Sequence, residues 1–300
     1  MAFTAADVKN LREMTGVGMM DCKKALTASD GDMDKAVEWL REKGMAASAK
    51  KAGRIAAEGM AYAAVIDGVG VVVEVNAETD FVGKNEKFVD FVKGVAATPA
   101  DLDALMECKY VGTDLTVTQQ QQEMVLVIGE NIKVRRFARF AENVSVPYVH
   151  AGGKIGVLVN LESDLPAEKV EEIGKDVAMQ IAALNPRFWD KSQVGQDVLD
   201  EEKKIMMVQM ENDPKMASKP EAVREKIVMG KLNKFYSENC LLQQEFVKDN
   251  SMSVEQYIAS AAKAAGGKVT FKDAIRFEKG EGIEKKQENF AEEIASMVKG

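Results

Sequence analysis

An internal repeat in the middle of the chain constrains the fold more than any other feature. Each copy contains two apolar strands around a glycine turn, followed by an amphipathic helix; the copies span Tyr62 to Pro99 and Tyr148 to Pro186. Within them, the run Val75 to Asp80 aligns with Val159 to Asp164. The repeat therefore predicts a duplicated α+β core of hairpin-plus-helix units, with small antiparallel sheets each covered on one face by helices.

The glycines of each copy lie between the two strands, at Gly68 and Gly70 in the first and at Gly152 and Gly153 in the second. Tight hairpin turns need positive φ angles, which glycine adopts without strain. A dinucleotide-binding loop would instead connect a strand to a helix. Further along the chain we expect a helix from Gln119 to Gly129 and a strand from Ile132 to Phe140 that closes the first copy.

The first 44 residues have the pattern of three short helices. Thr4 and Asp7 have capping-box spacing, and Gly16 and Gly18 interrupt the apolar pattern after the first helix. Asp32 can cap the third helix, which we expect to end at Gly44. The Ala/Lys-rich run from Ala46 to Ala57 is expected to be a helical or flexible connector.

A charged, methionine-rich region from Val198 to Phe235 follows the second copy, with a turn from Asp213 to Pro220, and would be inserted into the second core unit. We interpret it as an inserted helical hairpin. Its apolar residues allow two interpretations, simple packing between the two helices or a partner or dimer surface. The tail then has an expected strand from Ala274 to Glu278, a glycine-rich turn and a closing amphipathic helix from Phe290 to Val298.

Composition excludes several classes of protein. A net charge of -8 and a pI near 5.1 argue against direct nucleic-acid binding, which depends on contacts with phosphates. We expect the basic clusters at Lys50, Lys51 and Arg54 and at Lys133, Arg135 and Arg136 to be solvated faces. No signal peptide and no membrane-spanning run is evident. Three widely spaced cysteines fit reduced thiols, so we expect a cytoplasmic location.

Catalytic signatures are largely missing. The single histidine, His150, cannot form a metal cluster or a nucleophile–base pair of recognised spacing. Gly266-Gly267-Lys268 is not a phosphate loop, because Ala262 and Val269 replace the required glycine and hydroxyl residue. We therefore expect no enzyme activity, no cofactor and no bound metal. For His150 itself, a filler role at a strand end and a functional role both stay open.

The segment Thr79-Asp80-Phe81-Val82 follows a predicted strand and precedes a helix whose apolar face contains Phe88 and Val92. In one interpretation Thr79 or Asp80 caps that helix and Phe81 packs as a hydrophobic staple. In the other, a carboxylate and an aromatic ring are exposed on a rigid corner, an arrangement typical of binding hot spots. Both can hold together, since a well-capped corner is also rigid.

Several motifs resemble the elongation factor Ts family, in family order and over nearly the whole chain. They are Leu11 to Leu26 (LREMTGVGMMDCKKAL), Glu74 to Val82 (EVNAETDFV), Ile128 to Ile132 (IGENI), His150 to Val159, and Arg276 to Glu284 (RFEKGEGIE). Together these motifs are highly specific. The departures lie chiefly in the helical hairpin, where family sequences vary.

The resemblance implies a domain layout. Residues 1–54 would form a three-helix ubiquitin-associated-like domain and connector, and 55–140 a first core subdomain. Residues 141–300 would form a second core subdomain that includes the helical hairpin, 190–236, and a carboxy-terminal helical module, 286–300. Dimerisation through the hairpin is the least transferable implication.

The resemblance also implies a partner, the GTPase elongation factor Tu in its GDP-bound and nucleotide-free forms, whose GDP release this family promotes. Thr79, Asp80, Phe81 and Val82 match the segment that disturbs the Mg²⁺ and phosphate site of Tu. His150 would contact another Tu domain, and Met19, Met20 and Cys22 lie in the amino-terminal motif. The alternative function is a helical adaptor or binding module without exchange activity.

Overall fold

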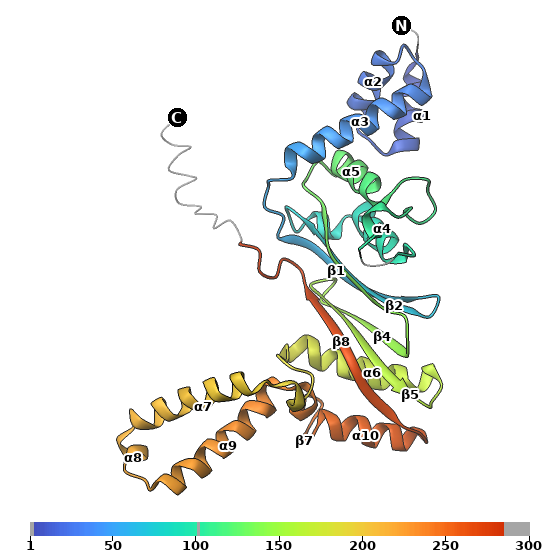
Figure 1. Cartoon of the computed structure of the whole chain (residues 1–300). Helices are drawn as coiled ribbons and strands as arrows, with labels where there is room; N and C mark the ends of the chain where they lie inside the picture. Colours follow the sequence, from blue (N-terminus) through green and yellow to red (C-terminus); the bar gives the residue numbers. More distant parts are fainter. Residues whose placement is uncertain (1–2, 101–102, 285–300) are drawn as a thin grey trace, which may run out of the picture.

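A computed structural model describes residues 3–100 and 103–284 of the chain, which adopt an elongated α+β fold (Figure 1). A bundle of three helices lies at one end, two small antiparallel sheets occupy the middle, and a helical hairpin projects sideways from the other end. The predicted closing helix from Phe290 to Val298 falls outside the described residues. None of the helices in residues 3–100 and 103–284 combines the length and the apolar character that a membrane span requires.

The amino-terminal bundle contains α1 (Ala5–Thr15), α2 (Met19–Ala28) and α3 (Met33–Lys51). The predicted capping box of Thr4 and Asp7 is present, and Asp32 caps α3 by accepting from the Lys35 amide. Our expectation that α3 ends at Gly44 was wrong. Gly44 instead lies where α3 crosses α5 (Val117–Ile128), and a Cβ there would lie 3.2 Å from the Gln122 carbonyl oxygen. This glycine permits close helix packing rather than ending the helix.

Two three-stranded sheets form the middle of the molecule. Sheet 1 has the order β1-β2-β3 and sheet 2 the order β4-β5-β8, and every neighbouring pair is antiparallel. Gly68, Gly152 and Gly153 have positive φ in the hairpin turns, as predicted. The expectation for Gly70 was wrong, because this glycine lies within the second strand of its hairpin and pairs with Val65. The strands are β1 (Glu58–Ile66), β2 (Val69–Ala77), β3 (Lys133–Phe140), β4 (Val144–His150), β5 (Ile155–Ser163) and β8 (Val269–Glu278).

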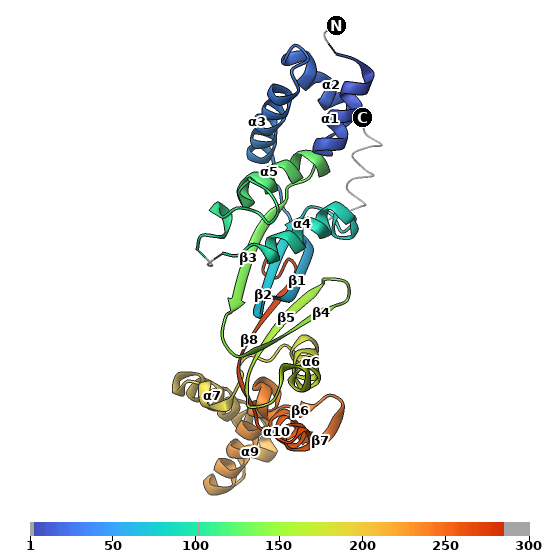
Figure 2. The same ribbon diagram turned by 90° about the vertical axis from the view of Figure 1, so that its right-hand side faces the viewer.

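The two sheets pack against each other, and helices cover their outer faces (Figure 2). α4 (Glu86–Ala97) and α5 bury the outer face of sheet 1, whereas α6 (Ala167–Leu184) and α10 (Val254–Ala265) bury that of sheet 2. Between the sheets, Val72 and Leu158 are fully buried. Gly156 brings β5 close to β1, since a Cβ there would lie 3.2 Å from the Ala61 carbonyl carbon.

The predicted helical insertion is formed by α7 (Gln196–Glu211), the short α8 (Pro214–Ala217) and α9 (Glu221–Asn239). Its own small core contains Met206, Met210, Val228, Leu232 and Phe235. Sequence reasoning missed α10 and the two-stranded ribbon that precedes it, β6 (Glu245–Phe246) and β7 (Asp249–Ser253). Ser253 and Gln256 form a capping box at the start of α10, a local signal that could have found this helix.

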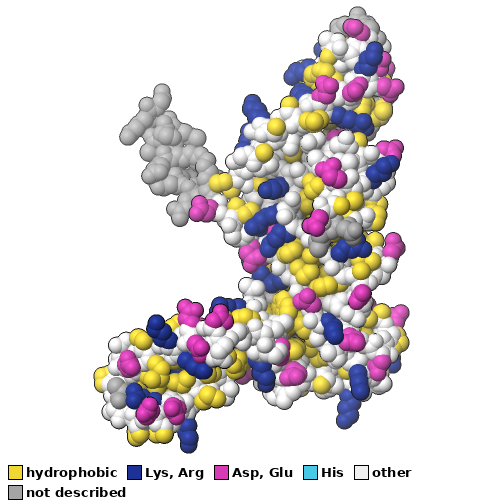
Figure 3. All heavy atoms as spheres, viewed as in Figure 1, with side chains coloured by type: hydrophobic (Ala, Val, Ile, Leu, Met, Phe, Trp, Pro, Cys, Tyr) yellow, Lys and Arg dark blue, Asp and Glu magenta, His cyan; other side chains and the backbone are white. Residues whose placement is uncertain are grey.

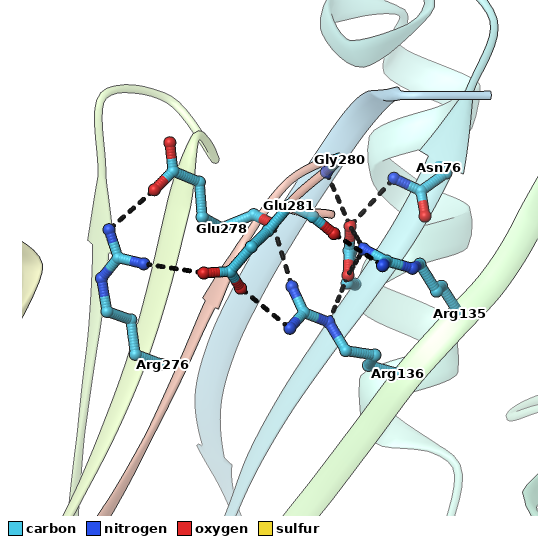
Figure 4. A network of polar contacts seen from close by, with 8 residues as sticks. Asn76, Arg135, Arg136, Arg276, Glu278, Gly280 and Glu281 are labelled. Atoms are coloured by element: carbon cyan, nitrogen blue, oxygen red, sulfur yellow. Dashed lines mark hydrogen bonds and ion pairs between the residues drawn. The ribbon is translucent and has the colours of Figure 1, made fainter. Parts of the chain in front are cut away.

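A network of polar contacts around a buried glutamate ties the two sheets together near the end of β8; Figure 4 shows it with Arg135, Arg136 and Gly280 labelled. Glu74 on β2 has no exposed surface, and its carboxylate accepts hydrogen bonds from Arg135, Arg136 and the Gly280 amide, the last at 2.8 Å. The register of β2 and β3 shifts beside Glu74, which pairs with Arg136 while Val75 pairs with Val134. Arg135 is thus the extra residue of a β-bulge, so two consecutive arginines reach one carboxylate.

The same arginines hold the chain that leaves β8. Arg135 donates to the Glu281 carbonyl oxygen at 2.6 Å, and Arg136 donates to the Glu278 carbonyl oxygen at 2.9 Å. Gly280 has φ 72°, and a Cβ there would lie 2.0 Å from the Ala57 carbonyl oxygen, so only glycine fits. Our expectation that Arg135 and Arg136 form a solvated basic face was therefore wrong. Their positive charges are instead paired with Glu74 and with backbone carbonyl oxygens of the same protein.

This network predicts a large and pH-dependent contribution to stability. Removing one partner of a buried ion pair costs about 3–5 kcal/mol, so Glu74→Ala should lower the free energy of unfolding by about that amount. Glu162→Ala on β5 is the matched control, because its ion pair with Lys272 is exposed and is expected to contribute at most about 1 kcal/mol. Chemical denaturation measures both variants.

The pH dependence follows from the direction of the pKa shift. Burial raises the pKa of Glu74, but hydrogen bonds from Gly280, Asn76 and Arg136 outweigh it, and the pKa lies below the ordinary glutamate value. The stabilisation is therefore complete above the unfolded-state pKa of about 4.3 and is lost as the pH falls through the lower folded-state pKa. The stability gap between wild type and Glu74→Gln should shrink in acid; a gap that widens there would contradict this account.

Candidate functional site

The predicted Thr79–Val82 segment forms a corner between β2 and α4. After β2 ends at Ala77, the chain runs through Glu78 to Phe81 and makes a single 3₁₀ turn, η1 (Val82–Lys84). Val82 is buried in the core under sheet 1, whereas Asp80 is exposed and Phe81 is 79% exposed. Burying the valine anchors the corner and leaves the neighbouring carboxylate and aromatic ring in solvent.

The interpretation of this segment as a helix cap was wrong. α4 begins at Glu86, and its cap is Asn85, whose side chain accepts from the amides of Lys87 at 3.0 Å and Phe88 at 3.4 Å. The 3₁₀ turn moves the start of the helix away from Thr79 and Asp80. With its ring in solvent, Phe81 is no hydrophobic staple either. The corner therefore keeps two side chains that the local fold does not use.

Glu130, from the Ile128–Ile132 motif, was assigned no role from the sequence, but it holds the corner in place. The Glu130 carboxylate accepts from the Glu78 amide at 3.0 Å, the Thr79 amide at 3.0 Å and the Thr79 hydroxyl at 2.6 Å. In return, the Glu78 carboxylate accepts from the Asn131 amide at 2.6 Å. Hydrogen bonds to a charged acceptor are the stronger kind, so this reciprocal arrangement fixes the backbone immediately before Asp80.

The start of β1 supports both the corner and the turn that follows His150. Gly83 lies against Gly59, and a Cβ on Gly83 would lie 2.8 Å from the Gly59 carbonyl oxygen. Two residues further along β1, the Ala61 amide donates to the Gly153 carbonyl oxygen at 2.8 Å. The Thr79–Val82 corner and the His150 turn are therefore attached to the same end of one strand.

His150 is the last residue of β4 and is exposed. One ring nitrogen, Nδ1, lies 3.0 Å from the Tyr148 hydroxyl, which orients the imidazole on the sheet edge. Since it is exposed, the imidazole is no core filler.

In the amino-terminal bundle, the three predicted contact residues of α2 differ in their exposure. Met19 and Met20 are 45% and 64% exposed at the start of the helix. Cys22 is fully buried, and its thiol donates to the Val17 carbonyl oxygen at 3.5 Å. Burial raises the pKa of Cys22, which keeps it protonated. The two methionines are thus available for contact, while the cysteine packs in the bundle core.

The described residues contain no group of three or more His, Cys, Asp or Glu side chains that could hold a metal ion. The three cysteines are all free thiols. What the corner offers is a fixed backbone with one carboxylate and one aromatic ring projecting from it, which suits insertion into a partner.

The corrected cap yields a test on the isolated protein. Asn85→Ala should lower the free energy of unfolding by about 1 kcal/mol, since it removes the α4 cap. Asp80→Ala should change it by less than about 0.5 kcal/mol, because the exposed carboxylate supports no helix. Thermal or urea unfolding measures both variants. A larger loss of stability for Asp80→Ala than for Asn85→Ala would show that Asp80 caps the helix.

Comparison with known proteins gives the family. A family model described as Elongation factor TS matches residues 78–281. The chain is 47% identical to elongation factor Ts of Clostridium kluyveri, with 99% of each chain covered. It is 48% identical to that of Clostridium perfringens over 98% of each chain, and 45% identical to that of Syntrophotalea carbinolica over the full length of both. On this evidence the chain belongs to the elongation factor Ts family.

Proposed function

We infer that this protein is a guanine-nucleotide exchange factor for the GTPase elongation factor Tu, and not an enzyme with a reaction of its own. Family membership supports the exchange function, and one structural observation supports the working residues: Phe81 is 79% exposed on a corner whose backbone is fixed by Glu130. A large apolar ring held in solvent at a rigid corner is the kind of residue that anchors an interface.

In the proposed mechanism, Asp80 and Phe81 insert beside the Mg²⁺ and phosphate site of Tu. Mg²⁺ demands near-ideal octahedral oxygen ligands, so a small displacement of its surroundings weakens both the metal and the phosphates that it bridges. GDP then leaves, and GTP can bind. Thermodynamic reciprocity applies: the factor by which this protein weakens GDP binding equals the factor by which GDP weakens binding of this protein.

The magnitudes require more than one contact. A thousandfold weakening of GDP corresponds to roughly 4 kcal/mol, whereas burying one phenylalanine contributes about 1.5–3 kcal/mol. We therefore assign further contacts to Met19 and Met20 on α2 and to His150 at the end of β4. Cys22 would contribute indirectly, by packing beneath the methionines. The interface then holds Tu open along much of this elongated molecule.

The shared strand order of the two sheets supports a duplicated core. In both sheets the middle strand belongs to the hairpin and the third strand comes from later in the chain. Both middle strands also have a register shift against their third strand, beside Glu74 on β2 and, two residues later in the aligned repeat, beside Asn160 on β5. We accordingly assign residues 1–54 to a ubiquitin-associated-like domain, 55–140 to one core subdomain and 141–300 to the other.

The family's place in translation makes the cytoplasm the proposed location. An adaptor without exchange activity is the rival function. It predicts that binding to Tu does not depend on bound nucleotide.

The hairpin is assigned a role in dimerisation because several of its apolar side chains are exposed. Apolar and charged side chains alternate along it in Figure 3. The exposed apolar residues are Ile205, Met207, Val208, Val223 and Met229. Exposed apolar residues of this kind, on an element that projects from the molecule, favour pairing with a second surface.

The corner predicts the effect of one substitution. Phe81→Ala should slow GDP release from Tu by roughly ten- to a hundredfold, the equivalent of the lost burial, while the isolated protein stays folded. Stopped-flow release of a fluorescent GDP measures the rate, and unfolding monitored by circular dichroism provides the stability control. If Phe81→Ala released GDP as fast as an active wild-type protein, Phe81 would not act by insertion beside the Mg²⁺ and phosphate site.

The hairpin assignment predicts self-association. Met229→Glu should shift the protein toward monomer in sedimentation velocity, because it places a charge among the exposed apolar residues. Lys226→Gln, on the same helix, makes an equal change in net charge without entering that group and should leave the dimer intact. A wild-type protein that sediments as a monomer at all concentrations would refute the dimer.

A further inference from the structure

The loop between α5 and β3, residues Gly129 to Asn131, contacts two separate parts of the molecule. On one side, Glu130 accepts the three hydrogen bonds from Glu78 and Thr79 described above. On the other, the Asn131 side chain donates to the Arg54 carbonyl oxygen at 2.8 Å, in the connector that follows α3. Lys51, the last residue of α3, donates to the Gly129 carbonyl oxygen at 2.5 Å.

Local geometry explains how so short a loop reaches both the corner and the connector that follows α3. Gly129 ends α5 in the left-handed conformation, with φ 87°, and its amide donates to the Val125 carbonyl oxygen. This turn lets two consecutive residues reach different segments. Glu78 completes the arrangement, since its carboxylate accepts from the Asn131 amide at 2.6 Å and lies 3.4 Å from the Arg54 guanidinium.

We propose that the Gly129–Asn131 loop is a positioning element that sets where the Asp80-Phe81 corner lies relative to the amino-terminal bundle. Glu130 holds the corner, and Asn131 holds the connector to the bundle. Neither side chain is assigned a contact with the metal or phosphates of Tu. The proposal rests on the exchange function and deepens it, because it names the residues through which the corner is held.

The two side chains should affect different kinetic quantities. Glu130 acts through the corner, which works when GDP is being displaced, so its loss should lower the maximal rate of GDP release at saturating protein. Asn131 acts through the bundle, whose contacts persist throughout the complex. Its loss should raise the protein concentration needed for half-maximal release and leave the maximal rate unchanged.

The experiment is stopped-flow release of a fluorescent GDP from Tu over a range of concentrations of the full-length protein. Glu130→Ala should lower the maximal rate by about tenfold in the wild-type background, the equivalent of one strong hydrogen bond. In the Phe81→Ala background the same substitution should change the rate by less than about twofold, because residues that act as one unit are not additive. Glu130→Gln keeps an oxygen acceptor and should restore most of the rate.

Glu107→Ala is the matched control, an exposed glutamate on the 3₁₀ turn η2 (Leu105–Glu107), and it should release GDP at the wild-type rate. If circular dichroism shows that Glu130→Ala does not fold, Thr79→Val replaces it, because that substitution removes one of the three hydrogen bonds. Thr79→Val should lower the maximal rate of GDP release by a smaller factor, and this effect should also disappear in the Phe81→Ala background.

The proposal would be overturned if Glu130→Ala lowered the maximal rate of GDP release by the same factor in the wild-type and Phe81→Ala backgrounds. Glu130 would then act independently of the corner. An Asn131→Ala variant that lowers the maximal rate alone would overturn the assignment of the connector. Failure of the wild-type protein to accelerate release is a different result, which would refute the exchange function itself.

Discussion

The buried carboxylate of Glu74 is the interaction on which the rest of the structure depends. It lies on the middle strand of sheet 1, yet two of its partners stand on β3 and a third, the Gly280 amide, follows the last strand of sheet 2. Two arginines, the Gly280 amide and the Asn76 side chain compensate for a desolvation that would otherwise be prohibitive. Because both arginines also bind the backbone of residues 278–281, the two sheets and the chain after β8 are fixed together around this carboxylate.

The Thr79–Val82 corner is also held rigidly by its neighbours. Val82 anchors the corner in the core, Glu130 fixes its backbone, and Gly83 packs against Gly59 on β1. The folded chain therefore carries the cost of ordering this segment before any partner is met. In the proposed mechanism, this leaves more of the contact energy of Phe81 for displacing GDP, and the further contacts proposed on α2 and at the end of β4 suit the elongated shape. A single aromatic ring could not supply a thousandfold effect alone.

Local patterns in the sequence predicted the hairpin turns at Gly68 and Gly152 and the caps at Thr4 and Asp32, since each is decided within a few residues. Interactions between distant segments were not predictable in this way. Glu74 and its arginines are about sixty residues apart, and their pairing depends on a β-bulge that the hydrophobic pattern of the strands does not predict. Asn85 was missed as a cap because a 3₁₀ turn delays α4, and Gly44 was misjudged because its small size serves packing against α5.

An exchange factor stabilises a state of Tu that binds GDP poorly. Isothermal titration of this protein into nucleotide-free Tu and into GDP-loaded Tu tests that property most directly. We expect tighter binding to the nucleotide-free form, by the same factor by which saturating protein weakens GDP binding. Equal affinity for the two forms would contradict it, because a partner that does not distinguish them cannot promote exchange.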